Sequence, residues 1–170
     1  MGKVTKSMIT SFSKFKSEWE KDAGSPEDSI MYYLIAALNI EKDPELADAM
    51  MTVVVSKRHC VESGDSPSGL RLGTTSKYGV GQFQRNKNIA RSYVGGTNKN
   101  GYKIDKKNLT MTVVKKEEQA KGLKFFIKSG GKDMPTPVTL QKNSSGQWKL
   151  TNYSSIYTGV KKTVEEEGDF

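Results

Sequence analysis

The sequence predicts an α+β fold, in which N-terminal helices pack on one face of a C-terminal antiparallel meander sheet. Two patterns support this class. Apolar residues recur at helical spacing in residues 3–55, and apolar and polar residues alternate in short runs after residue 108. Because the helices precede the strands instead of alternating with them, the pattern favours α+β over α/β. A chain of 170 residues fits one domain, expected over residues 24–163.

A first helix is predicted over residues 3–22. Its apolar side chains fall on one helical face: Met8, Phe12, Phe15 and Trp19. We therefore expect residues 1–23 to form an amphipathic N-terminal arm. The apolar face of this arm is expected either to bind a partner or to pack on its own domain.

Two further helices are marked by their start signals. Ser25 and Pro26, followed by two acidic residues, are typical of a helix N-terminus. The segment IMYYLIAALNI that follows is apolar on most sides, which indicates a central core helix. Asp43 and Pro44 repeat the start signal and predict a third helix through Met51 toward Val55.

Residues 56–101 are rich in turn-forming and basic residues, and they predict a long irregular segment with a short helix near residues 83–89. The basic residues that we expect to bind a partner are Arg58, Arg71, Lys77, Arg85, Lys87 and Arg91. The aromatic residues between them are Tyr78, Phe83, Tyr93 and Tyr102. In proteins that bind single-stranded nucleic acid, such basic residues follow the backbone and such aromatic residues stack on the bases. A solvated basic face with its aromatic residues in the core gives the same pattern.

Five runs near the C-terminus have period two and predict strands: LTMTVVK, LKFFIKS, PVTLQK, QWKL and SSIYTGV. The lysines on these strands are expected to solvate the outer face of the sheet: Lys115, Lys124, Lys128, Lys142 and Lys149. Residues 164–170 form an acidic C-terminal tail. The tail is expected to be solvated or to fold as a clasp over a basic patch.

Groups that support catalysis are scarce. His59 is the single histidine and Cys60 the single cysteine, and neighbours in sequence point in different directions on a helix or a strand. Together they supply only two of the four ligands of a structural zinc site. The sequence GVGQFQ lacks the third glycine of a dinucleotide-binding loop. The sequence therefore predicts a non-enzymatic protein without a catalytic residue, cofactor or metal.

The net charge of +8 favours acidic partners, namely an acidic protein surface or, less strongly, nucleic acid. No apolar run is long enough for a membrane span, and the N-terminus lacks the apolar core of a secretory signal. A single cysteine excludes an internal disulfide and fits a reducing compartment. We expect a cytoplasmic protein with no disulfide-linked partner.

Two segments, residues 90–104 and 124–162, resemble an uncharacterised domain family known from bacterial proteins. The resemblance lies in the motifs R-S-Y-x-x-G…N-x-Y and K-S-G-G-x-D-x-P-x-P-[IV]-T-L, followed by W…YSS. It implies that residues 1–23 are an added arm. The element order is also similar to cone-shaped α+β folds of the nuclear-transport-factor and cystatin kind. The family often has arginine where this chain has Thr136.

The most characteristic part of the resemblance is the loop KSGGKDMPTPVTL. Its motif residues are Ser129, Gly130, Gly131, Asp133, Pro135 and Pro137. We predict that the two glycines supply positive φ angles in a turn and that the two prolines aim the chain into the next strand. The loop contains no nucleophile paired with a base, so its predicted role is structural.

The leading functional hypothesis is a non-catalytic interaction or structural protein. It would dock through its basic surface and its arm onto an acidic macromolecular assembly, for example a cytoskeletal polymer such as a microtubule. Two alternatives remain. One is a small-ligand-binding or enzymatic domain with a pocket near Tyr32, Tyr93, Tyr102 and Trp148. The other is an RNA-binding protein.

Overall fold

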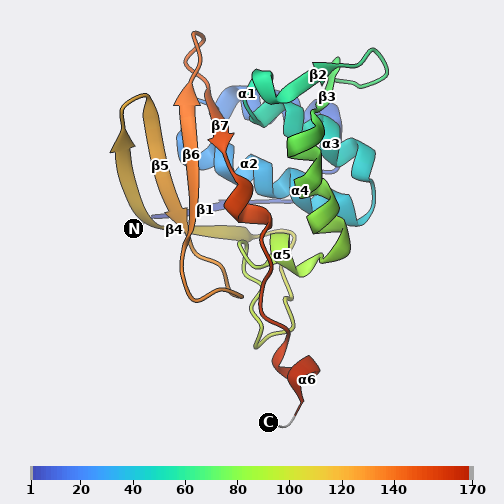
Figure 1. Ribbon diagram of the computed structural model, residues 1–170, viewed down its shortest axis with the longest axis vertical. Coiled ribbons are helices and arrows are strands. Elements are labelled where there is room, and N and C mark those ends of the chain that lie inside the picture. Colours follow the sequence, from blue (N-terminus) through green and yellow to red (C-terminus); the bar gives the residue numbers. More distant parts are fainter. Residues whose placement is uncertain (1, 169–170) are drawn as a thin grey trace.

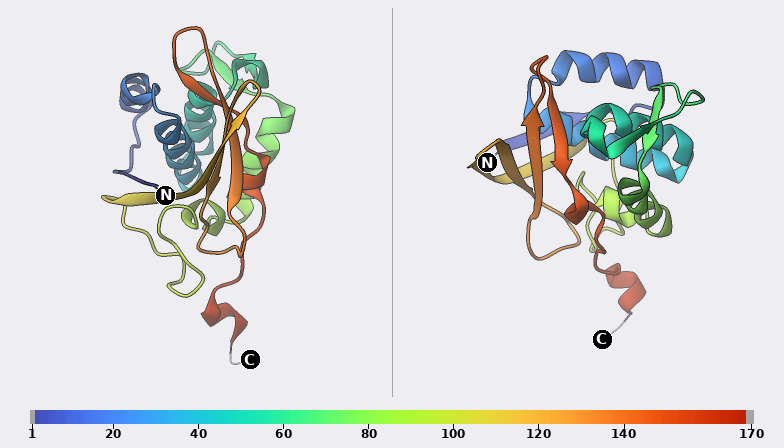
Figure 2. Two further views of the ribbon diagram at one scale, coloured as in Figure 1. Left: turned by 90° about the vertical axis from the view of Figure 1, so that its left-hand side faces the viewer. Right: turned by 45° about the horizontal axis from the view of Figure 1, so that its top comes forward.

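The computed structural model describes residues 2–168 and has the predicted α+β fold, with helices packed against a five-stranded antiparallel sheet (Figures 1 and 2). The sheet has the order β1 (Gly2–Lys6), β4 (Leu109–Gln119), β5 (Gly122–Ile127), β6 (Thr136–Lys142) and β7 (Trp148–Asn152). A second sheet pairs β2 (Cys60–Glu62) with β3 (Leu70–Leu72). The helices are α1 (Phe12–Asp22), α2 (Pro26–Leu38), α3 (Pro44–Val54), α4 (Thr74–Arg85), α5 (Asn88–Arg91) and α6 (Val164–Glu167). The 3-10 helices are η1 (Asn39–Glu41), η2 (Lys57–His59) and η3 (Ser154–Tyr157).

The core lies between the helices and the inner face of the sheet. Every residue of α2 from Ser29 to Leu38 is buried, as expected for a helix that is apolar on most sides. Leu109, Met111 and Val113 of β4 are buried against this layer, as the alternation predicts. The start signals of α2 and α3 are also confirmed. The Asp28 backbone amide donates to Ser25 Oγ at 3.4 Å, and the Leu46 amide donates to Asp43 Oδ1 at 3.1 Å.

The predicted helix over residues 3–22 is wrong in its first half, because residues 2–6 form β1 at the edge of the main sheet. The apolar spacing that suggested one helix belongs to α1 and the turn before it. Phe15 and Trp19 are buried in the core of the same domain, and Met8 and Phe12 pack against that core. The segment therefore packs in cis, which leaves Phe15 and Trp19 unavailable to a partner.

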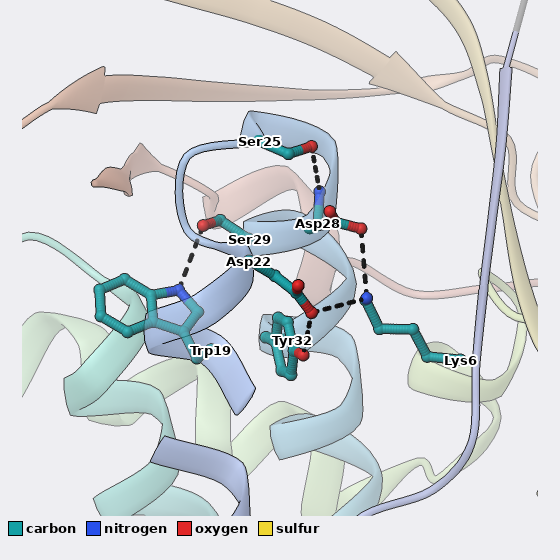
Figure 3. A network of polar contacts seen from close by, with 7 residues as sticks. All are labelled: Lys6, Trp19, Asp22, Ser25, Asp28, Ser29 and Tyr32. Carbon is teal, nitrogen blue, oxygen red and sulfur yellow. Dashed lines mark hydrogen bonds and ion pairs between the residues drawn. The ribbon is translucent and has the colours of Figure 1, made fainter. Parts of the chain in front are cut away.

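A polar network fixes this segment to the rest of the domain (Figure 3). Lys6 Nζ lies 3.1 Å from Asp22 Oδ2 and 3.3 Å from Asp28 Oδ1. The Tyr32 hydroxyl donates to the same Asp22 oxygen at 2.6 Å. Trp19 Nε1 donates to Ser29 Oγ at 3.1 Å. The network joins β1, α1 and α2 into one unit.

The central segment is more regular than predicted. Helix α4 was missed, and the short helix expected near residues 83–89 is wrong, because α4 ends at Arg85 and α5 begins at Asn88. Two glycines inside α4 look like turn residues in the sequence. Gly79, however, lies against the Tyr157 ring, where a Cβ would overlap with the ring atoms. This glycine permits close packing and does not mark a turn.

The prediction that SSIYTGV is a strand is also wrong, since η3 occupies residues 154–157. Another segment already contacts the middle of the β7 edge. Val55 forms a parallel bridge to Leu150, and the Ser56 amide donates to the Leu150 carbonyl at 2.8 Å. A sixth strand would have to displace these contacts. The chain then runs away from the body of the molecule to α6 (Figures 1 and 2). The last two residues of the acidic tail lie outside the described residues.

The loop after β5 has a structural role, as predicted, but its two glycines do not act through positive φ angles. Neither Gly130 nor Gly131 has a positive φ angle. Instead, a Cβ at Gly130 would overlap with the Gly96 carbonyl oxygen, and one at Gly131 would overlap with the Tyr102 hydroxyl. The Gly130 amide also donates to the Ser92 carbonyl at 2.7 Å. The two motif segments of the resemblance therefore pack directly on each other.

The other motif residues of this loop are mostly structural. Ser129 is buried, and its hydroxyl donates to Ser92 Oγ at 2.8 Å. Asp133 forms an ion pair with Lys161 Nζ at 2.5 Å. Pro135 lies just before β6, and Pro137 pairs with Phe126 within it. The loop therefore links β5 and β6 and holds the chain that leaves η3.

Candidate functional site

A pocket of about 410 Å³ lies where η2, the first turn of α4 and the corner between β7 and η3 meet. We call it the His59 pocket. Its wall is formed chiefly by Arg58, His59, Thr74, Thr75, Ser76 and Tyr153. Within the described chain, the residues that line it carry basic groups, hydroxyls and amides but no carboxylate. The N-cap of α4 is Gly73, which offers no side-chain oxygen to the amides of the first turn.

A chain of hydrogen bonds crosses the wall of this pocket. Ser76 Oγ lies 2.8 Å from the Tyr153 hydroxyl, which lies 3.0 Å from His59 Nδ1. If Nδ1 carried the proton, it would donate to Tyr153, Tyr153 to Ser76, and the Ser76 proton would have no acceptor among the described contacts. In the opposite direction, Ser76 donates to Tyr153 and Tyr153 donates to Nδ1, and the proton on Nε2 is then the one without an acceptor. Both directions leave one proton without a partner in the described chain, and it belongs to Ser76 or His59, which both line the pocket.

Burial sets the charge states of His59 and Tyr153. Burial and the neighbouring Arg58 guanidinium both lower the pKa of His59 below its ordinary value. Burial raises the pKa of Tyr153 to about 12. Near neutral pH the imidazole and the phenol are therefore both uncharged. The pocket therefore presents a neutral imidazole beside the permanent charge of Arg58.

The geometry gives no activated nucleophile at this site. Tyr153 separates His59 from Ser76, so the imidazole does not accept the serine proton directly. Cys60 Sγ is directed to the Ser56 carbonyl oxygen at 3.8 Å, and burial raises the pKa of its thiol. His59 and Cys60 thus have different partners. Among residues 2–168, no cluster of three or more histidine, cysteine or acidic side chains is placed to hold a metal ion.

The basic residues named from the sequence divide into three groups. Arg91 forms an ion pair with Glu41 at 2.8 Å, so its charge stabilises the fold. Arg71 and Lys77 line a groove of about 590 Å³ that also contains Asp43, Glu45, Asp48 and Asp65. Arg58, Arg85 and Lys87 are exposed and, in the described part of the chain, make no ion pair.

The exposed side of α4 carries two of these six residues, Lys77 and Arg85. Its buried side consists of Ser76, Gly79, Val80 and Phe83. Lys77, Tyr78 and Arg85 lie on the exposed side, and Lys87 follows directly after the helix. We call these four residues the basic α4 surface. Figure 1 shows α4 on the side of the molecule away from β4 and β5.

The aromatic residues of the central segment are mainly core residues. Phe83, Tyr93 and Tyr102 are buried, whereas Tyr78 is 60% exposed. Tyr93, which was expected near a ligand pocket, donates to the Ile156 carbonyl at 2.9 Å. Neither Tyr93 nor its proposed neighbours Tyr32, Tyr102 and Trp148 line the His59 pocket or the larger groove. The pocket expected at these residues therefore stays a prediction.

Lys132, in the β5–β6 loop, is the centre of another group of polar contacts. Its Nζ donates to the Tyr93 hydroxyl at 2.7 Å, the Ser155 carbonyl at 3.0 Å and Thr158 Oγ1 at 2.6 Å. No carboxylate in the described chain forms an ion pair with it, and burial lowers its pKa to about 8. Lys132 therefore ties the β5–β6 loop to η3 with neutral oxygen atoms only.

Comparison with known proteins places the chain in a family but gives no function. No curated protein matches it. No solved structure matches it either, so the likeness to cone-shaped folds stays a prediction. No helix within residues 2–168 is long and apolar enough to cross a membrane. The model of a family described as a domain of unknown function, DUF6935, matches residues 8–164. The prediction that residues 1–23 precede the family-like part is therefore wrong from residue 8 onward. Because this match spans nearly the whole chain, from α1 to the start of α6, the protein belongs to the DUF6935 family.

Proposed function

We propose that the protein is a non-catalytic interaction module that docks on an acidic macromolecular assembly through its basic α4 surface. The observation that carries this proposal is the group of exposed cations without carboxylate partners around α4. Arg85 and Lys87 are both exposed, and no ion pair within residues 2–168 neutralises either of them. Charges left free on one face favour an oppositely charged partner and speed its approach.

The N-terminal segment has no part in this docking. Its apolar stripe was expected to contact the partner, but Phe15 and Trp19 are buried within the domain. Tyr78 is a better candidate for an apolar anchor, because it is 60% exposed and lies on α4 between the basic residues. Tyrosine is enriched among the residues that dominate protein–protein binding energy.

The partner in this proposal is an acidic protein assembly in the cytoplasm, for which a cytoskeletal polymer such as a microtubule is the model. The net charge of +8 supports such a partner. RNA is the competing polyanion. The burial of Phe83, Tyr93 and Tyr102 disfavours it, because only Tyr78 of these four aromatic residues is placed to stack on a base.

A pair of double variants tests the proposal by co-sedimentation with polymerised tubulin. Arg85→Glu with Lys87→Glu reverses two charges on the proposed surface. The matched control, Lys14→Glu with Lys16→Glu, reverses two exposed charges on α1. We expect the first variant to lose at least about tenfold in affinity and the control to keep most of it.

The same experiment separates the alternatives. Equal losses in both double variants would show that only net charge matters and would reject a docking face on α4. If the wild-type protein ignores tubulin but binds single-stranded RNA with a steep salt dependence, the RNA hypothesis replaces the proposal.

A further inference from the structure

We propose that the His59 pocket binds the phosphoryl group of a phosphate monoester. The proposal rests on the side chains of the pocket and does not depend on the docking role of the basic α4 surface. The pocket is a separate cavity. It is lined by residues from η2, α4 and the β7–η3 corner, and it shares none of the four residues of that surface.

The first argument is the unpaired proton in the chain of hydrogen bonds around His59. With one direction of the hydrogen bonds this proton belongs to Ser76 and with the other to His59 Nε2, and both residues line the pocket. In the described chain, Nε2 has no hydrogen-bond partner. One hydrogen-bond donor in the pocket wall therefore has no acceptor in the described chain. A phosphoryl oxygen is a strong acceptor of this kind.

The second argument is charge. Arg58 lines the pocket, is exposed and makes no ion pair with any described residue. The lining residues also include no carboxylate, although the neighbouring groove at α3 contains four. An anion in the pocket would meet a guanidinium, which binds phosphate through paired hydrogen bonds, and would meet no like charge.

The third argument concerns the number and spread of donors. Thr74 and Thr75 of α4 and Ser154 of η3 add further hydroxyls to the pocket wall. Donors on several sides suit the three terminal oxygens of a tetrahedral phosphoryl group better than the two coplanar oxygens of a carboxylate. The first turn of α4 adds weak favourable polarity but does not carry the proposal.

The volume limits the ligand further. At about 410 Å³ the pocket lies near the lower end of the range for small-ligand sites, yet it is larger than a phosphate ion requires. The group attached to the phosphate therefore has room in the pocket. This group can come from a phosphorylated metabolite or from a phosphorylated side chain, which present the same chemistry to Arg58 and His59.

The single histidine of the chain provides the test. The ring protons of His59 are followed by NMR while inorganic phosphate is added to the full-length protein at constant ionic strength, with chloride as the reference salt. We expect a saturable shift and a rise in the pKa of His59 by about one pH unit, because a bound anion favours the imidazolium. Glucose 6-phosphate and a phosphoserine peptide are then compared. Whichever binds more tightly identifies the source of the phosphoryl group.

Two variants make the result decisive. Arg58→Gln is expected to weaken phosphate binding about tenfold. The matched Arg71→Gln variant removes an exposed charge outside the pocket and is expected to bind like the wild type. An absent or unsaturable shift, or equal effects of the two variants, would overturn the proposal. The double variant Arg85→Glu with Lys87→Glu is expected to keep the phosphate response. The phosphate result can therefore be interpreted even if the docking proposal fails.

Discussion

The network around Lys6 and the His59 pocket use similar side chains in opposite ways. Lys6 has two carboxylate partners, Asp22 and Asp28, and Asp22 also accepts the Tyr32 hydroxyl proton (Figure 3). Burial lowers the pKa of Lys6, but its hydrogen bond to Asp22 and the charges of Asp22 and Asp28 outweigh this effect and raise it. In the pocket, Arg58 has no counter-charge and His59 Nε2 has no hydrogen-bond partner in the described chain.

The difference separates structural polar groups from binding groups. Where each donor meets an acceptor of opposite charge, the polar groups hold elements of the fold together. Where donors exceed acceptors, the same kinds of side chain are prepared for a ligand. Variants on the two sides of this comparison should therefore affect different properties: stability at the network and binding at the pocket.

The largest effect on stability is expected at the network. Trp19→Ala removes a buried indole and leaves Ser29 without its donor, so we expect a loss of about 3–5 kcal/mol in the free energy of unfolding. Urea unfolding followed by circular dichroism measures it. Tyr78→Ala, at an exposed aromatic residue, is the control and should change stability by less than about 0.5 kcal/mol. Similar losses in both variants would contradict the placement of Trp19 in the core.

The next effect on stability concerns the packing of α4 on η3. In α4, Gly79→Ala places a methyl group against the Tyr157 ring, and the overlap is expected to cost about 1–3 kcal/mol. Gly81→Ala is the matched change in the same helix. There the nearest atom is the Arg85 guanidinium at 3.4 Å, which belongs to a flexible exposed side chain. This variant should gain up to about 1 kcal/mol from helix propensity. Thermal unfolding of both proteins decides between close packing and a turn at Gly79.

A smaller loss is expected for Asp22→Asn, which weakens the link between Lys6 and Tyr32. Burial raises the pKa of Asp22, but the hydrogen bonds from Tyr32 and Lys6 outweigh it and lower the pKa below its ordinary value. The carboxylate therefore stabilises the fold above its unfolded pKa, and this contribution is lost as pH falls through the folded pKa. Because Asp22 is partly exposed, we expect about 1 kcal/mol at pH 7. The difference from the wild type should shrink toward pH 3 in urea unfolding. A constant difference would contradict a charge effect.

The regular parts of the fold were predictable because their signals are local. The caps at Ser25 and Asp43, and the alternation of Leu109, Met111 and Val113, depend on neighbours in sequence. Strand β1 was not predicted, because its five residues include two lysines and have no clear period. Only its pairing with β4 makes it a strand. The η3 segment was wrongly predicted as a strand from its period of two, and the β7 edge beside it already bridges Val55 at Leu150.

The candidate site was less predictable than the fold. Arg58 and His59 were identified as basic or titratable residues, but their partners lie far along the chain. His59 and Tyr153 are 94 residues apart, and Ser76 and Tyr153 are 77 apart. No sequence period connects such positions, and α4 itself was obscured by its glycines. The pocket exists only because the missed helix brings Ser76 beside the end of β7.

Lys132 lies between the two cases and gives the smallest expected effect. Like Lys6 it has several polar partners, three against two, but like Arg58 it has no carboxylate partner in the described chain. Its folded pKa of about 8 lies below the ordinary 10.5, so between these values the folded state releases its proton before the unfolded state does. The unfolded state then binds more protons, and stability rises with pH across this window. Below pH 8 the full cost of burying the charge is present.

Lys132→Met removes this titration. The free energy of unfolding of the wild type relative to the variant should therefore increase from pH 8 to pH 10.5. We expect an increase of about 1 kcal/mol or less, because the amine is only half-buried and water screens its charge. Lys128→Met, at an exposed lysine, controls for the loss of charge and should give no such increase. If the relative stability of the wild type instead falls over this window, Lys132 is held by a negative charge, and it would belong with Lys6 on the structural side of the comparison.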